Sequence, residues 1–342
     1  IFRCLHLADG LRKADVEAVF LMLESSRTGR VPGFLEKSGY GVFTVSGDDP
    51  WRQDDARLTA VLQGQGLAVI LVDQLVPDAT DDDLLGSADY QPADLPGTLK
   101  LLQGQGMRVA CISDRYDRMD LDVEIVFNGC PAQDPAWYEA ATATRYRLGP
   151  DYYMLPESFR RCAATPRAFR TARPKTLLFF GGNDHCGFTA PTLEALAPLR
   201  DRIDVEAIVG AATPDGDAVA SGLRAQGITV HYGAPDLAPI LADADLAFLA
   251  SGNTLFDAAA LGLPALALST RVRQRVTAQH FDRVGSAIDL GTMDDADWPG
   301  VTKLVEDLIF DVERLQTMRA AGRAEIDGDG MKRVIDDLLS LY

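Results

Sequence analysis

The sequence is poor in the residues that build metal sites and disulfide scaffolds. Its 342 residues include five cysteines and four histidines, scattered along the chain and without C-x-x-C spacing. Neither set resembles a zinc site, and a disulfide framework is not expected in a chain of this length. The thiols therefore indicate a reducing compartment, and we expect a cytoplasmic protein that needs no metal or cofactor.

Long apolar runs and an excess of positive charge are also missing. No stretch approaches the roughly 18 apolar residues of a membrane-spanning helix, so no span is predicted. Lys and Arg number 33 against 50 Asp and Glu, which gives a net charge of −17. This balance argues against nucleic acid or an anionic membrane as a partner. A small anionic ligand would need local helix ends and arginines to offset the negative field.

What the sequence does contain is an alternation of helical and apolar segments. Residues 58–73, 99–114 and 221–233 each run from a helical pattern through a glycine into a short apolar strand. Further apolar strands are predicted at Gly41–Val45, Val123–Phe127, Thr176–Phe180 and Val205–Val209. Such alternation predicts an α/β fold whose parallel sheets carry helices on both faces.

The composition changes over residues 150–175, which are rich in Pro and Arg and weakly periodic. We therefore predict a Rossmann-like domain over 1–150, a linker over 151–175 and a second Rossmann-like domain over 176–342. The two doubly wound domains would face a cleft, and the terminal helices from Val301 onward would pack back on the first domain.

The first predicted domain opens directly on a helical pattern, IFRCLHLADGLRKA, without a signal peptide. We therefore expect its first strand, with the turn that follows, to be missing from the sequence.

The most informative segment is Asp245–Leu268, an apolar strand followed by a polar turn, a short helix and a second apolar strand. The turn consists of Ser251, Gly252, Asn253 and Thr254. We expect Asn253 or Thr254 to cap the helix, which should end near Gly262. Backbone N–H groups at a helix start, together with the helix dipole, favour a phosphate. The segment therefore indicates a nucleotide or sugar-phosphate ligand.

A second strand-to-helix turn lies at residues 176–189, where an apolar strand runs into Gly181, Gly182, Asn183 and Asp184. Paired glycines let the backbone approach a ligand closely. Thr189 is expected to cap the following helix. The alternative is a tight connection without a ligand, but two such turns in one domain favour the ligand.

Three aspartates occupy positions from which they can serve a ligand. Asp257 lies three residues after Thr254 and can either bind a ribose diol or close a capping box. Asp73 and Asp114 each end an apolar strand. They can orient a sugar or share acid–base work, and the alternative is that they cap the next helix or turn.

Three further residues are candidates for the first domain and its border. Arg3 starts the first helix, where it can face an anionic ligand or stay solvated. Tyr152 and Glu157 fall in the predicted linker, where they can line the cleft or pack between the domains.

Together these segments resemble one family. IFRCLHLADGL, RLGPDYYMLPESFR, LLFFGGNDHCGFT and DLAFLASGNTLFDAAALGLPALAL with Gln274 are similar, in this order, to the UDP-sugar hydrolases of pseudaminic acid biosynthesis, the PseG/SpsG-like group. That group is related to MurG-like glycosyltransferases with two Rossmann-like domains, so the resemblance implies a GT-B-like fold.

The resemblance also implies an activity and a site. The family hydrolyses a UDP-linked 2,4-diacetamido-trideoxy sugar without a metal and releases UDP. The implied UDP contacts are Gly181, Gly182, Asn183, Asp184, Ser251, Gly252, Asn253, Thr254, Asp257 and Gln274. The implied sugar contacts are Arg3, Asp73 and Tyr152, and Asp114 and Glu157 are the candidate catalytic carboxylates. The family's catalytic His would fall immediately before Ile1.

Departures from the family pattern keep two alternatives open. Asp257 stands where the family has Glu, His185 replaces a Pro, and Arg273 replaces the Asn before Gln274. The first alternative is a glycosyltransferase that passes the sugar to an acceptor. The second is a catalytically silent protein that binds a UDP-sugar.

Overall fold

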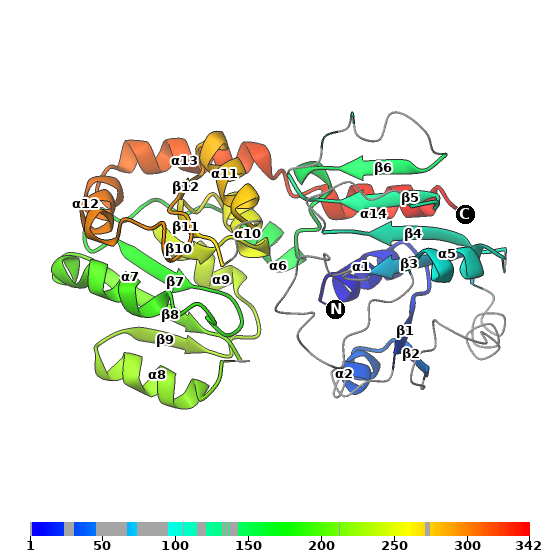
Figure 1. Ribbon diagram of the computed structural model, residues 1–342, viewed down its shortest axis with the longest axis horizontal. Helices are drawn as coiled ribbons and strands as arrows, with labels where there is room; N and C mark the ends of the chain where they lie inside the picture. Colours follow the sequence, from blue (N-terminus) through cyan, green and yellow to red (C-terminus); the bar gives the residue numbers. More distant parts are fainter. Residues whose placement is uncertain are drawn as a thin grey trace. The chain divides into compact units, whose positions relative to one another are not determined.

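The structure is a computed structural model that describes residues 2–23, 31–45, 67–73, 95–104, 106–114, 121–131, 134, 136, 143–211, 213–270 and 274–342. It divides into two compact units (Figure 1). The N-terminal unit comprises Ile1–Met154 and Asp329–Tyr342, and the C-terminal unit comprises Leu155–Gly328.

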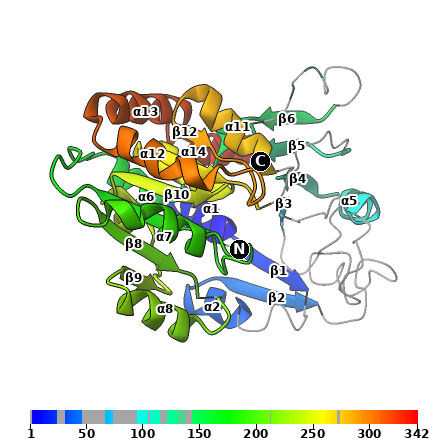
Figure 2. The same cartoon turned by 60° about the vertical axis from the view of Figure 1, so that its left-hand side comes forward.

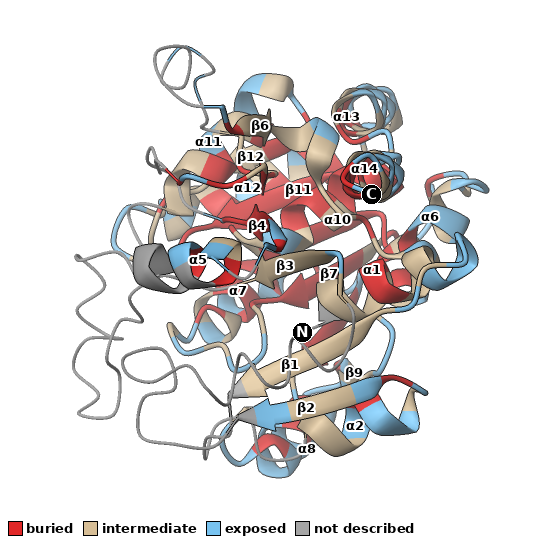
Figure 3. Ribbon diagram, turned by 90° about the vertical axis from the view of Figure 1, so that its right-hand side faces the viewer, coloured by how far each residue is buried: buried red, intermediate tan, exposed pale blue. Residues whose placement is uncertain are grey.

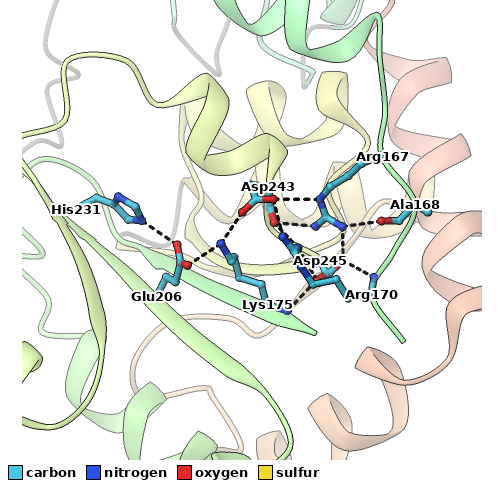
Figure 4. A network of polar contacts seen from close by, with 8 residues as sticks. All are labelled: Arg167, Ala168, Arg170, Lys175, Glu206, His231, Asp243 and Asp245. Carbon is cyan, nitrogen blue, oxygen red and sulfur yellow. Dashed lines mark hydrogen bonds and ion pairs between the residues drawn. The ribbon is translucent and has the colours of Figure 1, made fainter. Parts of the chain in front are cut away.

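The expected linker over 151–175 is largely part of the C-terminal unit. Helix α6 (Glu157–Ala163) packs against α9 (Ala238–Ala242) and α10 (Asn253–Leu261). The segment after α6 is tied to the amino edge of the sheet by Arg167 and Arg170, which bind the carboxylates of Asp243 and Asp245 (Figure 4). Asp245 is fully buried, so its contacts with both guanidinium groups fix the path of this segment.

The C-terminal unit contains one sheet with the strand order β12-β11-β10-β7-β8-β9, and every pairing is parallel. The strands are β7 (Lys175–Phe179), β8 (Asp204–Val209), β9 (Thr229–Tyr232), β10 (Leu246–Ala250), β11 (Ala265–Leu268) and β12 (Ala287–Asp289). Two of them, β7 and β8, begin one residue before the strands predicted at Thr176 and Val205. After the first residue of each strand, consecutive residues are buried, which matches central strands of a covered sheet.

Helices cover both faces of this sheet. Leu178, Phe248 and Leu266 belong to a core that also contains side chains of α7 (Thr189–Leu196), α8 (Gly216–Ala225) and α12 (Trp298–Ile309). The alternate residues Leu177 and Leu249 are equally buried. Helices α10 and α11 (Arg275–Val284) contact β11, and α13 (Val312–Glu325) packs on α10. The short 3-10 helix η3 (Ala197–Leu199) extends α7.

The N-terminal unit contains two parallel sheets in the described residues. One pairs β1 (Val19–Leu23) with β2 (Gly41–Val45), and the other has the order β3-β4-β5-β6 (Figure 2). Its strands are β3 (Val69–Asp73), β4 (Arg108–Ile112), β5 (Ile125–Asn128) and β6 (Arg145–Leu148). Although β3 is apolar on both faces, all its residues are only half-buried, because it lies at the edge of its sheet (Figure 3). The strand predicted before the first helix stays a prediction.

The alternation of side chains along β4 explains how helices are shared between the faces of this sheet. Val109 and Cys111 pack with α5 (Leu95–Gly104). Ala110 and Ile112 face the opposite side and pack with α1 (Phe2–Lys13) and α14 (Gly330–Leu339). The terminal helix α14 therefore belongs to the N-terminal unit, whereas α12 and α13 stay in the C-terminal unit. Helix α2 (Val31–Lys37) precedes β2, and the 3-10 helix η2 (Pro150–Tyr152) follows β6.

Three findings bear on membrane spans, metal sites and disulfides. Within the described ranges, no helix has the length and apolar character needed to cross a bilayer. The same ranges hold no group of three or more His, Cys, Asp or Glu side chains that could bind a metal ion. The five cysteines all lie in these ranges, and none forms a disulfide there.

Helix α14 approaches the backbone of η2 closely at its first residue. A Cβ at Gly330 would lie 2.1 Å from the carbonyl oxygen of Tyr153 and 3.0 Å from that of Asp151. We expect Gly330→Ala to lower the free energy of unfolding by about 1–3 kcal/mol, because backbone atoms cannot yield as a side chain can. Urea unfolding measures this change.

The matched control is Gly222→Ala in α8, where a Cβ would meet nothing within 4 Å. This variant should be neutral or stabilising by up to about 1 kcal/mol, because alanine favours a helix. Equal unfolding free energies for the two variants would contradict the packing of α14 on η2.

Candidate functional site

Two of the predicted strand-to-helix turns lie at one edge of the C-terminal sheet. Strand β10 pairs in parallel with β7 on one side and with β11 on the other. The turns that follow these strands are therefore neighbours at their carboxyl ends. We call Gly181–Asp184 the glycine turn and Ser251–Thr254 the serine turn. Ser269 and Thr270 follow β11 at the same edge, and Gln274 directly precedes α11.

The glycine turn is shaped by backbone conformations that suit its residues. Gly181 has a φ of 84°, in the left-handed region that glycine enters without strain. Asp184 accepts hydrogen bonds from the backbone N–H groups of Phe188 at 2.9 Å and Thr189 at 3.0 Å. The cap of α7 is thus the Asp184 carboxylate and not Thr189. The Asp184 carboxylate is thus engaged by the helix start, and its UDP contact stays a prediction.

The glycine turn rests against the end of the next strand. A Cβ at Gly210, directly after β8, would lie 2.2 Å from the carbonyl oxygen of Gly182. The Thr213 hydroxyl donates a hydrogen bond of 3.3 Å to the same oxygen. Gly182 and Asn183 themselves are exposed. The contacts of Gly210 and Thr213 therefore hold the Gly182 carbonyl in place, while Gly182 and Asn183 stay accessible to solvent.

The serine turn leads into α10 differently from the prediction. The N-cap residue is Gly252, which has no side chain to cap with, and Asn253 is the first helical residue. Neither Asn253 nor Thr254 is the cap. The end of the helix agrees with the prediction, because Gly262 adopts a φ of 69° as its C-cap. By its position, the start of α10 carries the positive end of the helix dipole at the carboxyl edge of the sheet.

Ser251 lies beneath the serine turn. Its side chain is fully buried, and its oxygen accepts a hydrogen bond of 2.9 Å from the Ser269 hydroxyl. Its backbone N–H donates to the carbonyl oxygen of Leu268 at 2.9 Å. Through these contacts Ser251 supports the turn from inside, and its UDP contact stays a prediction. Asp257 is half-buried in the first turns of α10, and its ribose contact stays a prediction.

The loop after β11 joins the other turns through Thr270. The Thr270 hydroxyl donates a hydrogen bond to Oε1 of Gln274. The Cys186 thiol lies 3.8 Å from the Thr270 carbonyl oxygen, which connects this loop to the segment after the glycine turn. Gln274 is half-buried and is the N-cap residue of α11. Its predicted contact with UDP stays a prediction.

In the N-terminal unit, three predicted residues form one cluster. Arg3 from α1 donates to Asp73 at the end of β3 through both Nε, at 2.9 Å, and Nη2. Its Nη1 reaches both oxygens of Asp114 at 2.7 Å. The Cys4 thiol donates to Oδ2 of Asp73 at 2.7 Å. We call Arg3, Cys4, Asp73 and Asp114 the Arg3 cluster.

The charges of the Arg3 cluster decide what it can bind. Burial alone would raise the pKa of Asp73, but the hydrogen bonds and charge of Arg3 outweigh it and lower that pKa. Burial, followed by the charge of Asp73, raises the pKa of the Cys4 thiol to about 12. One guanidinium serves two carboxylates, so Arg3 is already occupied. Its predicted contact with the sugar stays a prediction, and the two carboxylates are the acceptors of the cluster.

The remaining two predicted residues, Tyr152 and Glu157, contact neighbouring side chains of their own units. The Tyr152 ring packs on Phe127, with ring centroids 6.3 Å apart, and adds to the core between the sheet and α14. Its expected role in sugar binding stays a prediction. Glu157 is 54% exposed and forms an ion pair of 3.7 Å with Arg160, one turn along α6. Its catalytic role stays a prediction.

Sequence reasoning missed the residues that hold the turns in place. These are Gly210, Thr213, Ser269, Thr270 and Cys186. A signal was present for two of them, because Gly210 and Ser269 directly follow buried strands. Their partners lie in other turns of the sheet, so sequence spacing could not pair them.

Comparison with solved structures defines the fold class as GT-B-like, with two Rossmann-like domains, as predicted. The chain is similar to MurG of Acinetobacter baumannii, with a TM-score of 0.68 at 11% identity over 99% of this chain and 95% of that one. It is also similar to UDP-GlcNAc 2-epimerase of Neisseria meningitidis bound to UDP-GlcNAc, with a TM-score of 0.63 at 12% identity over 99% and 96%. At these identities the likeness shows the fold alone.

Two curated proteins are similar in sequence, and no protein-family model matches the chain. Spore coat polysaccharide biosynthesis protein SpsG of Bacillus subtilis is 29% identical over 211 residues, which are 58% of this chain and 59% of that protein. Uncharacterized protein MJ1062 of Methanocaldococcus jannaschii is 22% identical over 282 residues, 80% of this chain and 53% of that protein. The chain thus spans less than two thirds of either relative.

The Arg3 cluster predicts a dependence of stability on pH. The folded pKa of Asp73 lies below its unfolded value of about 3.9. Its ion pair therefore stabilises the fold above that pH, and the stabilisation is lost as the pH falls through the folded pKa. We expect Asp73→Asn to cost about 2 kcal/mol of unfolding free energy at pH 7. This cost should shrink below about pH 4.

Urea unfolding of both proteins across a pH series measures the difference. A gap between the two proteins that stays constant or widens on acidification would rule out the Arg3–Asp73 pair as its source.

Proposed function

We propose that the protein binds a UDP-sugar and hydrolyses it to UDP and a free sugar in surface-polysaccharide or nonulosonic acid synthesis. The observation that carries the proposal is the adjacency of the glycine turn and the serine turn on paired parallel strands. Support also comes from SpsG, whose name places it in spore coat polysaccharide biosynthesis, and from the epimerase solved with UDP-GlcNAc. The diacetamido-trideoxy sugar rests on the family resemblance.

The diphosphate is proposed to meet backbone amides at both turns. Gly181, Gly182 and Asn183 would contribute from one turn, and Asn253 and Thr254 from the other. The Gly252 N–H donates to the carbonyl oxygen of Ala250 at 2.8 Å, so Gly252 would line the site without donating. Gln274 would add a side-chain donor, and Asp257 would bind the ribose. Because the chain has a net charge of −17, such local donors must offset the long-range field. Asp184 and Ser251 support the turns in this proposal.

The same donors would assist the reaction. Breaking the bond between the anomeric carbon and UDP places negative charge on the departing phosphate oxygen, and fixed amides and a helix start stabilise that charge. The glycine turn and the serine turn are therefore proposed to stabilise the leaving group as well as to bind the substrate.

For the N-terminal unit we propose that the Arg3 cluster handles the sugar. The Asp114 side chain is 44% exposed, against 15% for Asp73, so Asp114 is the accessible carboxylate of the cluster. Arg3 holds it in one orientation through Nη1. Asp114 is thus proposed to accept a hydrogen bond or a proton from the sugar or the attacking water. Glu157 stays the second catalytic candidate.

One alternative function is a glycosyltransferase. Its support is the fold likeness to MurG and to the calicheamicin glycosyltransferase CalG4, the latter with a TM-score of 0.60 at 13% identity over 100% of this chain and 94% of that one. A transferase needs an acceptor, whereas a hydrolase uses water. A catalytically silent UDP-sugar-binding protein is the other alternative.

The decisive experiment combines binding and turnover. Purified protein is titrated with UDP by calorimetry, then incubated with UDP-sugars, including a diacetamido-trideoxy sugar, while free UDP is assayed. Release of UDP without an acceptor supports the hydrolase. Release only with an acceptor shows the transferase, and binding without release shows the silent protein. Absence of UDP binding would overturn the proposed site.

The close contact beneath the glycine turn gives a sharper prediction. We expect Gly210→Ala to weaken UDP binding by about tenfold, because its Cβ would push the Gly182 carbonyl away by overpacking. Calorimetry measures the affinity, and Gly222→Ala again provides the control with an unobstructed Cβ. If Gly210→Ala folds and binds UDP as the control does, the glycine turn is not a ligand contact.

A further inference from the structure

Thr270 follows β11 at the carboxyl edge of the C-terminal sheet, where it contacts both Gln274 and the segment after the glycine turn. Its hydroxyl donates to Oε1 of Gln274, and its carbonyl oxygen accepts from the Cys186 thiol. Resting on the proposed function, we propose that Thr270 is a positioning residue that orients the Gln274 side chain for the diphosphate. Thr270 itself would not touch the ligand.

The argument begins with the chemistry of the carboxamide. A glutamine side chain has an oxygen that only accepts and a nitrogen that only donates, at two ends of one planar group. Because Oε1 is bound by the Thr270 hydroxyl, the donor Nε2 is the end that remains for another partner. A diphosphate offers acceptors alone, so only this orientation attracts it. The reversed amide would place its oxygen against phosphate oxygens.

The Thr270 hydroxyl can hold the Gln274 carboxamide in place because the backbone of Thr270 is itself fixed. The preceding residue, Ser269, is 1% exposed and donates through its hydroxyl to Ser251 at 2.9 Å. The Ser269 N–H donates to the carbonyl oxygen of Gly291 at 2.7 Å. On the other side, the Cys186 thiol meets the Thr270 carbonyl at 3.8 Å. Contacts from both sides thus place Thr270 relative to the serine turn.

The test compares two substitutions at one position. Thr270→Val keeps the shape and removes the hydroxyl, whereas Thr270→Ser keeps the hydroxyl. We expect Thr270→Val to weaken UDP binding by calorimetry about three- to tenfold, the range of one hydrogen bond. We expect Thr270→Ser to bind as the wild type does. Urea unfolding of both variants shows that they remain folded when their affinities are compared.

A double-mutant cycle separates positioning from general structure. In a Gln274→Ala background, Thr270→Val should cause no further loss of UDP affinity, because the group it orients is gone. Additive losses would overturn the proposal, and so would a Thr270→Val variant with wild-type affinity. A wild-type protein that binds no UDP would instead overturn the proposed function, so the two failures are distinct.

Discussion

The parallel pairing of β10 with β7 and β11 is the constraint on which the C-terminal unit depends. In a parallel sheet every strand ends at the same edge, so the turns after these three strands become neighbours whatever their separation in sequence. Each turn also contacts a residue that directly follows another strand. Gly210 leaves room for the Gly182 carbonyl, and the Ser269 hydroxyl donates to Ser251. The sheet brings the turns together, and these contacts fix their backbone.

The amino edge of the same sheet has a different chemistry. There, charged side chains neutralise one another, as Asp243 and Asp245 bind Arg167, Arg170 and Lys175 (Figure 4). Such a network satisfies the charges buried at that edge and ties the segment before β7 to the sheet. At the carboxyl edge, by contrast, the contacts between the turns run through backbone carbonyls and hydroxyls, and the Asp184 carboxylate binds two backbone N–H groups at the start of α7.

Much of this fold could be predicted from the sequence, because short apolar strands ending in glycine turns are local signals. The strands β7 and β8, the C-cap Gly262 and the carboxyl-edge position of both turns follow from such signals. The roles of individual polar residues could not be predicted. Asp184 caps α7, and Arg3 is taken up by Asp73 and Asp114, 70 and 111 positions away. Only the folded chain decides which polar partner a side chain meets.

The two candidate sites therefore favour opposite kinds of ligand group. The turns of the C-terminal unit offer N–H donors, which suit phosphate oxygens and the charge of a leaving group. The Arg3 cluster of the N-terminal unit combines one positive and two negative side chains, so it offers carboxylate acceptors to hydroxyl or amide N–H groups. Each unit therefore carries its own kind of hydrogen-bonding surface: backbone N–H groups and a helix start in the C-terminal unit, and paired carboxylates in the N-terminal unit.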